Sequence, residues 1–357
     1  MLGHPSFVVD GMLVHNTATP VYNYGGEIHN VIEIVQPGTL GTRTEFLREW
    51  CGREGSSESI EREGTGDMRK ASVTDPVALG LHLRDCGVYL RRTRADVGRE
   101  LPSLQRVFHY VEGDDSVKKI EDQIEKLCRT ILEGTRDERF EAAGELDWKL
   151  RKATGLSKVM EAASFIRLLV EDGEKVLVYG WHHEVYDELM RILRDEKLDG
   201  GDLNPALYTG RETQRKKEIE RARFMGGPTL AQAKVDYNDA RLQETNVMLM
   251  SVRAGAGLDG LQFVCSTVVF VELDWSPGVH EQAEGRVYRD GQGLPVMVYY
   301  VVINEGSDPV VLDTLNLKTS QSEGIRNLRT DVETLQGADP NKMRALAERW
   351  LRDHGKI

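Results

Sequence analysis

The stretch NVMLMSVRAGAGLDGLQFVCSTVVFVELDWSPGVHEQAEGRVYRDGQ, residues 246–292, decides the fold of this chain. Its apolar run at 247–250 stops at a Gly-rich turn, and a second apolar run at 267–273 ends in Asp and Trp. Short apolar runs bounded by glycine turns predict two buried strands. The polar segment that follows predicts a helix. This helix carries Gln282, Gly285, Arg286 and Arg289 before a turn at Gly291.

Two arginines of this expected helix are three residues apart. Residues at that spacing share a helical face, so Arg286 and Arg289 are predicted to point the same way. A guanidinium is permanently charged and donates a planar fork of N–H bonds, which suits phosphate oxygens. The pair therefore predicts a polyphosphate site. A charged surface helix that stops at a glycine is the simpler alternative for an isolated pair of this kind.

The string QAEGRVYRDGQ, residues 282–292, resembles the sixth motif of superfamily 2 helicases, and most closely that of the Swi/Snf-type double-stranded-DNA translocases. In those enzymes the motif reads Gln-x-x-x-Arg-x-x-Arg-x-Gly-Gln, and every position is present here. DEAD-box RNA helicases usually open the motif with His where this chain has Gln282. The resemblance implies that Arg286 and Arg289 are arginine fingers for ATP hydrolysis and that Gln282 assists them. It also implies ATP and Mg²⁺ as cofactors of the complete enzyme.

The Gly-rich turn upstream resembles the fifth motif of the same family. Relatives usually carry Arg-Ala-Gly-Gly-x-Gly-x-Asn-Leu, whereas residues 253–261 read RAGAGLDGL, with shifted glycines and Gly260 in place of Asn. The resemblance implies loop positions near DNA or nucleotide. The expected DNA-side residues are Ser251 and Arg253, and the expected nucleotide-side residues are Gly255, Gly257 and Asp259. The departure from the pattern affects the expected contact by Asp259 most.

Two stretches nearer the amino terminus resemble other parts of these translocases. TATPVYNYGGEI, residues 17–28, is similar to the third helicase motif, with Ala in place of the usual Gly at its second position. LGLHLRDCGVYLRRTRADVGRELP, residues 79–102, carries the paired arginines of the family at Arg91 and Arg92. The resemblance implies that Thr19, Arg91 and Arg92 lie near DNA.

The first sixteen residues, MLGHPSFVVDGMLVHN, predict a β-hairpin. Asp-Gly at 10–11 supplies the positive φ angles of a two-residue turn between apolar runs. The ending His15-Asn16 followed by Thr17 resembles the carboxyl-terminal junction of an intein. In that family the Asn amide attacks its own carbonyl, the His assists, and the next hydroxyl accepts an acyl group. The resemblance implies an intein remnant at 1–16. The amino-terminal intein blocks do not occur in the sequence, so splicing is expected to need a partner fragment or a longer precursor.

Apolar runs alternate with helical segments through the second half of the chain. The runs lie at 176–179, 206–208, 247–250, 268–273 and 296–302. Such alternation predicts an α/β fold with a parallel sheet and helices on both faces. Together with the motifs, it resembles the second RecA-like helicase lobe. The expected domains are an intein remnant at 1–16, the end of a first RecA-like lobe with a helical protrusion at 17–113, a helical linker at 114–152, the carboxyl-terminal RecA-like lobe at 153–317, and a helical tail at 318–357.

Composition indicates a globular chain, with 40% hydrophobic and 29% charged residues and enough length for two domains. The net charge of −12 disfavours a broadly basic nucleic-acid surface. The four cysteines form no CxxC pair and the histidines show no metal-ligand spacing, so no metal site is predicted. No apolar run approaches the roughly 20 residues of a membrane span. The expected location is the cytoplasm of a bacterium or a phage-infected host cell.

No G-x-x-x-x-G-K-[ST] string occurs in the sequence, so a Walker A phosphate loop is not expected in this chain, nor is ATP hydrolysis by the chain alone. We therefore predict the carboxyl-terminal part of an ATP-dependent double-stranded-DNA translocase, whose partners are double-stranded DNA and an amino-terminal helicase lobe. Two alternatives stay open. One is a non-catalytic nucleic-acid-binding or subunit-interaction fragment, and the other is an RNA-directed helicase.

Overall fold

The structure is a computed structural model of the 357-residue chain. It describes residues 6–9, 12–15, 25–52, 71–89, 100–227, 229, 242–252, 258–315 and 342–356. The chain divides into two compact units. Unit 1 comprises Met1–Val97, Trp275–Gly278 and Asp313–Pro340, and unit 2 comprises Gly98–Asp274, Val279–Leu312 and Asn341–Ile357.

Unit 1 begins with the predicted hairpin. Strands β1 (Ser6–Val9) and β2 (Met12–His15) pair antiparallel, and Val9 lies opposite Met12 at the closed end. This register matches a two-residue turn at the Asp-Gly pair, so the hairpin is confirmed. His15 is the last residue of β2, whereas Asn16, Thr17 and Thr19 lie outside the described residues.

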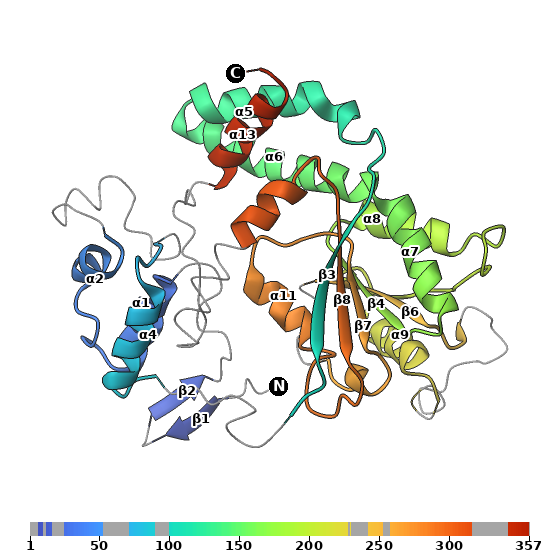
Figure 1. Ribbon diagram of the computed structural model, residues 1–357, viewed down its shortest axis with the longest axis horizontal. Helices are drawn as coiled ribbons and strands as arrows, with labels where there is room; N and C mark the ends of the chain where they lie inside the picture. The colour runs from blue at the N-terminus through green and yellow to red at the C-terminus, as the bar shows by residue number, and fades with distance from the viewer. Residues whose placement is uncertain are drawn as a thin grey trace. The chain divides into compact units, whose positions relative to one another are not determined.

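Three helices form the rest of the described part of unit 1 (Figure 1): α1 (Glu27–Val35), α2 (Arg43–Trp50) and α4 (Pro76–Asp85). Helix α2 starts with a capping box in which Thr42 and Glu45 bond each other's backbone N–H groups. Helix α4 starts at Asp75, whose carboxylate accepts the Ala78 N–H at 2.9 Å. The buried core of these helices comprises Ile28, Ile32, Leu40, Phe46, Leu47, Ala71, Val73, Leu79 and Leu83.

Unit 2 is built on a six-stranded sheet in the order β3-β8-β7-β4-β6-β5, and every pairing is parallel. The strands are β3 (Leu104–Tyr110), β4 (Val176–Gly180), β5 (Ala206–Tyr208), β6 (Val247–Ser251), β7 (Thr267–Phe270) and β8 (Val296–Val302). Central strands buried on both faces read as continuous apolar runs, which is why the sequence revealed them. The predicted α/β fold with a parallel sheet is confirmed.

Side chains alternate between the two faces of this sheet. On one face Val178, Leu249 and Val269 pack against α7 (Val159–Glu171) and α8 (His183–Leu193). On the other face Tyr179 stacks on Phe270 with ring centroids 5.1 Å apart, and its hydroxyl donates to a carbonyl of α11 (Pro277–Glu284). Helices therefore cover both faces, as the pattern predicted. Helix α9 (Gln214–Met225) packs beside β5 (Figure 1).

The charged segment after β3 is helical, as predicted. It contains a short 3-10 turn, η3 (Lys118–Ile120), followed by α5 (Glu121–Glu133) and α6 (Arg136–Ser157). The carboxyl-terminal helix α13 (Lys342–Asp353) packs against α5 and α6 (Figure 1). Three apolar residues of this helix, Leu346, Trp350 and Leu351, are buried. Among the described residues, no helix has both the length and the apolar character that a membrane crossing requires.

Two details of unit 2 differ from the sequence-based expectation. Residues 104–110, placed before the carboxyl-terminal lobe by the expected boundary at 113, form the edge strand β3 and pair with β8. Helix α11 ends at Glu284, so Arg286 and Arg289 lie in the turns that follow and not on one helical face. The backbone N–H groups of Arg286 and Val287 donate to the third residue back, to Ala283 at 3.2 Å and to Glu284 at 2.9 Å. Gly285, a weak helix former, marks the change.

Candidate phosphate-binding site

Arg286 and Arg289 turn toward one loop. The Arg286 Nη1 donates a long hydrogen bond of 3.5 Å to the carbonyl oxygen of Leu258. The Arg289 Nη1 lies 3.2 Å from Oδ1 of Asp259 and forms an ion pair with it. The prediction of a shared helical face was wrong, yet the two guanidiniums converge on residues 258–259, in the second half of the Gly-rich stretch.

Asp259 is the centre of this loop. Its carboxylate accepts the Gly260 N–H at 2.8 Å and the Gln262 side-chain amide at 3.3 Å. These two hydrogen bonds, and then the Arg289 charge, hold the pKa of Asp259 below its usual value. Its backbone carbonyl accepts Nη2 of Arg221 from α9 at 2.8 Å. Gly260 has φ +96°, a left-handed conformation that explains glycine at this position.

The ion pair in this loop is open to solvent. The Arg289 side chain is 36% exposed and that of Asp259 is 64% exposed, while Arg286 is half-buried. Exposed ion pairs contribute little to stability, because water solvates both charges in their absence. A phosphate group can therefore replace the carboxylate as the partner of Arg289 without loss of the local fold. The arrangement is suited to anion binding.

The end of the sixth motif holds the arginine segment in place. The Gln292 Nε2 donates to the carbonyl oxygens of Cys265 at 2.9 Å and Val287 at 3.3 Å. Gly291 has φ +96°, and a Cβ there would stand 2.6 Å from the Phe263 ring. Because Cys265 lies two residues before the start of β7, the segment lies by the amino-terminal edge of the sheet. These contacts of Gly291 and Gln292 account for the Gly-Gln pair at the end of the motif.

The other predicted site residues divide into two groups. Gln282 is exposed on α11, and Ser251 is half-buried at the carboxyl-terminal end of β6. The structure therefore places Ser251 at the opposite edge of the sheet from the Gln292 and Cys265 contact. The remaining predicted contact residues lie outside the described residues. They are Arg91, Arg92, Arg253, Gly255 and Gly257, together with Thr19.

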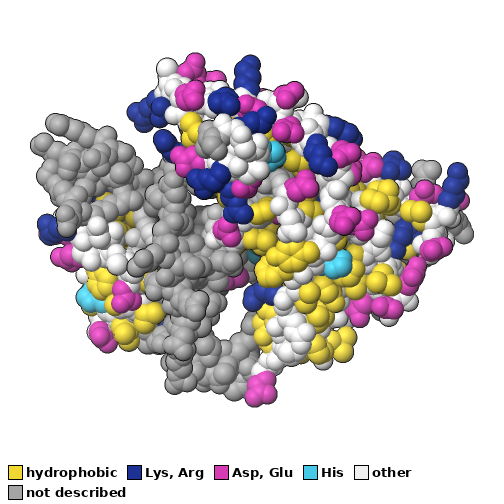
Figure 2. Space-filling view, turned by 45° about the horizontal axis from the view of Figure 1, so that its top comes forward, with side chains coloured by type: hydrophobic (Ala, Val, Ile, Leu, Met, Phe, Trp, Pro, Cys, Tyr) yellow, Lys and Arg dark blue, Asp and Glu magenta, His cyan; other side chains and the backbone are white. Residues whose placement is uncertain are grey.

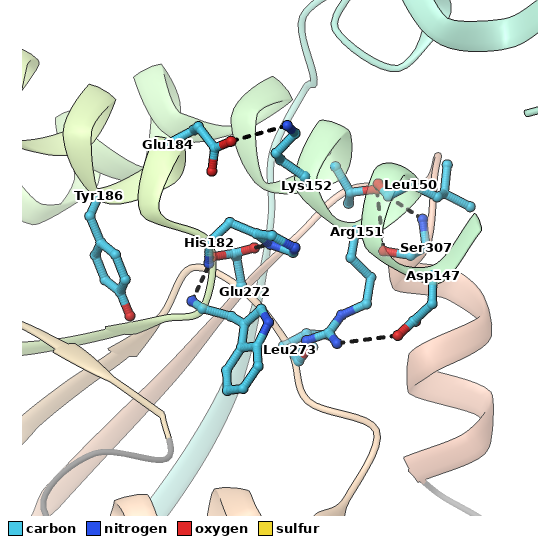
Figure 3. A network of polar contacts seen from close by, with 12 residues as sticks. Asp147, Leu150, Arg151, Lys152, His182, Glu184, Tyr186, Glu272, Leu273 and Ser307 are labelled. Carbon is cyan, nitrogen blue, oxygen red and sulfur yellow. Dashed lines mark hydrogen bonds and ion pairs between the residues drawn. The ribbon is translucent and has the colours of Figure 1, made fainter. Parts of the chain in front are cut away.

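Sequence analysis missed a buried polar network at the carboxyl-terminal edge (Figure 3). Glu272, two residues after β7, accepts the backbone N–H groups of Trp181 at 2.6 Å and His182 at 2.9 Å. Its other oxygen lies 2.5 Å from His182 Nδ1, and both side chains are nearly fully buried. The carboxylate thereby ties the segment after β7 to the segment after β4. The available signal was a polar residue two positions after the end of each of two buried strands.

Helix α6 lies over this network. The Arg151 guanidinium donates to the carbonyl oxygen of Leu273 at 2.9 Å, and Lys152 pairs with Glu184 at 3.1 Å (Figure 3). These contacts join α6 to the ends of β7 and α8. The network fixes backbone positions, and Nε2 of His182 is buried within it without a hydrogen-bond partner.

Metal and thiol chemistry find no support in the part of the chain that the structure describes. No cluster of three or more His, Cys, Asp or Glu side chains there could hold a metal ion. The four cysteines are free thiols, and burial raises the pKa of Cys265 and of Cys128 to about 12. A thiol with so high a pKa is a poor nucleophile at neutral pH.

Comparisons with known proteins agree with the motifs, although no family model matches the chain. It is 24% identical over 342 residues to the "DNA annealing helicase and endonuclease ZRANB3" of Bos taurus, which covers 94% of this chain and 29% of that protein. It is 22% identical over 293 residues to a "SWI/SNF-related matrix-associated actin-dependent regulator of chromatin subfamily A-like protein 1" of Xenopus tropicalis, covering 82% of this chain and 28% of that one.

A bacterial relative is matched over a larger share of its length. The "Uncharacterized ATP-dependent helicase YqhH" of Bacillus subtilis is 24% identical over 343 residues, which is 89% of this chain and 55% of that protein. The chain thus spans less than a third of the two animal relatives and about half of YqhH. Over most of its own length, the chain is thus similar to proteins named as a DNA annealing helicase, a SWI/SNF-related regulator and an ATP-dependent helicase.

Proposed function

We propose that this chain is the carboxyl-terminal portion of an ATP-dependent double-stranded-DNA translocase or helicase. The observation that carries the proposal is the convergence of Arg286 and Arg289 on residues 258–259. The relatives named as ATP-dependent and DNA helicases support it. In this reading the chain supplies arginines to a nucleotide whose phosphates are mostly held by an amino-terminal lobe.

The two arginines would act on the transferred phosphoryl group of ATP. Charge spreads over its oxygens in the transition state, and a guanidinium aimed at them lowers the barrier. Arginine fingers of this kind accelerate hydrolysis by roughly 1,000- to 100,000-fold. Arg289 is free to reach phosphate once it leaves Asp259, and Gln282 would assist from α11. Mg²⁺ would neutralise phosphate charge, with ligands from the other lobe.

Double-stranded DNA is the proposed nucleic acid, with Ser251 and Arg253 among its contacts. Figure 2 shows that, among the described residues on that face, basic and acidic side chains are interspersed and do not form one basic patch. The net charge of −12 points the same way. We therefore expect DNA contact to be local, through backbone phosphates, and to weaken steeply with salt.

The test is an ATPase assay of the chain joined to a first lobe that carries the Walker A and Walker B motifs. We expect stimulation by duplex DNA and a loss of at least about 1,000-fold in kcat in Arg286→Ala. Arg129→Ala is the matched control, because Arg129 is an exposed arginine paired with Glu125 on α5. Stimulation by RNA instead of DNA would favour an RNA-directed helicase. No hydrolysis with any nucleic acid would favour a non-catalytic binding or subunit-interaction fragment.

We also propose that residues 1–16 are an intein remnant with its junction at His15, Asn16 and Thr17. A hairpin whose second strand ends at His15 supports this proposal. Mass spectrometry of the mature protein from its source cell is the test. We expect a peptide that joins an upstream residue directly to Thr17, and no such peptide when the precursor carries Asn16→Ala. A mature peptide that runs through Asn16 into Thr17 would refute the proposal.

A further inference from the structure

Glu284, the last residue of α11, is a buried carboxylate directly before the arginine segment. Its side chain is 4% exposed. One oxygen accepts Nε of Arg106 at 2.9 Å and the hydroxyl of Tyr300 at 2.6 Å. The other accepts Nη2 of Arg106 at 2.7 Å. Both carboxylate oxygens are therefore satisfied, and two residues further on the chain reaches Arg286.

Arg106 reaches this carboxylate from a distant part of the sequence. It lies in the middle of β3, opposite Val298 of β8, and 178 residues separate it from Glu284. Strand β3 is also the first element of unit 2 after the division at Val97 and Gly98. The contact thus ties the end of α11 to an edge strand of the sheet.

Aromatic side chains of the sheet also pack against α11. His280 of α11 lies against Phe270 and Tyr300, with ring centroids 4.9 and 5.5 Å apart. The Tyr179 hydroxyl donates to the carbonyl oxygen of Ala283 at 3.1 Å. These contacts fix the distance between α11 and the sheet. The Arg106 guanidinium makes the charged contact with the last residue of α11, from which the backbone continues toward Arg286.

We infer that Arg106 is a positioning residue for Arg286 and Arg289. A guanidinium that bonds both oxygens of Glu284 fixes the rotation of the last helical turn, and hence the direction in which the arginine segment leaves it. The inference rests on the proposed function for its catalytic consequence. The structural claim, that the contact with Arg106 fixes the direction of the arginine segment, does not depend on the proposed function.

Hydrogen exchange on the chain itself tests the structural content. The amides of Gly285, Val287 and Tyr288 donate to carbonyls of α11 at 2.8 to 2.9 Å. In Arg106→Gln we expect these amides to exchange at least about tenfold faster, because a hydrogen-bonded charge is lost from a buried carboxylate. Amides of β4 should keep their rates. Arg211→Gln is the matched control, since Arg211 contacts both oxygens of the exposed Asp187.

The ATPase assay of the joined protein tests the positioning role. We expect Arg106→Gln to lower kcat about tenfold while KM for ATP changes less than about twofold. Arg106→Lys should recover only part of kcat, because an ammonium lacks the planar fork. Tyr300→Phe removes one hydrogen bond and gives a smaller loss, which keeps the test available if Arg106→Gln fails to fold.

Two results would overturn the inference. One is unchanged exchange at residues 285–288 in Arg106→Gln. The other is equal acceleration there and in β4, which would mean a general loss of stability. An inactive wild-type joined protein would refute the proposed function instead. The exchange measurement on the chain alone would still decide whether Arg106 holds the segment.

Discussion

The two edges of the sheet in unit 2 hold their charges differently. At the carboxyl-terminal edge, Glu272 and His182 are buried together, and Lys158 pairs with Asp308 at 2.6 Å beside the end of β8. Near the amino-terminal edge, Arg289 and Asp259 form an ion pair that is largely exposed. Charges at the carboxyl-terminal edge are buried away from water and depend on their protein partners. Charges near the amino-terminal edge are exposed, so they can exchange partners. This difference supports the proposal that phosphate binds near the amino-terminal edge.

The largest expected effect lies in the buried pair. Lys158 is fully buried and donates to Asp308 and to the carbonyl oxygen of Val301, both at 2.6 Å. Burial raises the pKa of Asp308, and the Lys158 charge partly offsets that rise. Lys158→Met leaves the carboxylate unpaired, so we expect a loss of about 3 to 5 kcal/mol in the free energy of unfolding, measured with urea.

A second substitution is the control for this prediction. Adding Asp308→Asn removes the stranded charge while an amide oxygen can still accept the Ile303 N–H, which Asp308 accepts at 3.1 Å. The double variant should regain a large part of the lost stability. A single variant as stable as the wild type would show that the carboxyl-terminal edge does not depend on buried charge.

A pH titration gives an intermediate effect. Burial lowers the pKa of His280 to about 4 from an ordinary 6.5, while Asp274 and Glu284 oppose that shift. The unfolded chain therefore binds a proton between pH 6.5 and pH 4 that the folded chain does not, and stability falls as the pH falls through this window. From pH 7 to pH 5 we expect this residue to cost ~2 kcal/mol.

His280→Gln is the comparison that isolates this contribution. Gln cannot be protonated but can still accept the Asp274 N–H, which His280 accepts at 2.8 Å. The difference in unfolding free energy between pH 7 and pH 5 should shrink in the variant. An identical pH dependence in both proteins would mean that His280 does not titrate in this range.

The smallest effect on stability is expected at the exposed pair. Asp259→Asn should leave the urea midpoint unchanged, because the pair is solvated. It should tighten tripolyphosphate binding to the chain about fivefold, because Arg289 no longer has a competing carboxylate at contact distance. Calorimetric titration measures the affinity, and Asp187→Asn, another exposed carboxylate paired with an arginine, is the control. Equal affinities for both variants would remove Asp259 from the site.

How far the sequence predicted the fold depends on burial. The strand at Val296–Val302 lies inside the sheet and has the predicted bounds, because a buried parallel strand is a continuous apolar run. The edge strand at Ala206–Tyr208 was predicted as well, since its three residues are all apolar. Strand β3, LQRVFHY, was missed. It is an edge strand with most side chains exposed, and Gln105, Arg106 and His109 interrupt its apolar residues, so it contains no continuous apolar run. Helix α11 ended earlier than predicted, because the polar sequence pattern does not show where the Glu284 carboxylate is held by Arg106 and Tyr300.

The site was predictable only as a set of residue types. The spacing in the sixth motif pointed to two arginines with a common target, and the structure brings both to residues 258–259. Their actual partners, Leu258 and Asp259, come from a loop that only the folded sheet brings near. Glu272 and His182 are 90 residues apart, and no local pattern joins them. Contacts between distant segments depend on strand order, which periodicity does not encode.

The dependence of α11 on β3 sets where a minimal version of this lobe can begin. A fragment cut after Tyr110 would lose the outer neighbour of β8 and the partner of Glu284 at once. It would expose a row of unpaired backbone groups on β8, which invites association between chains. Any truncated protein meant to stay monomeric and to keep its arginines in place should therefore start before Leu104.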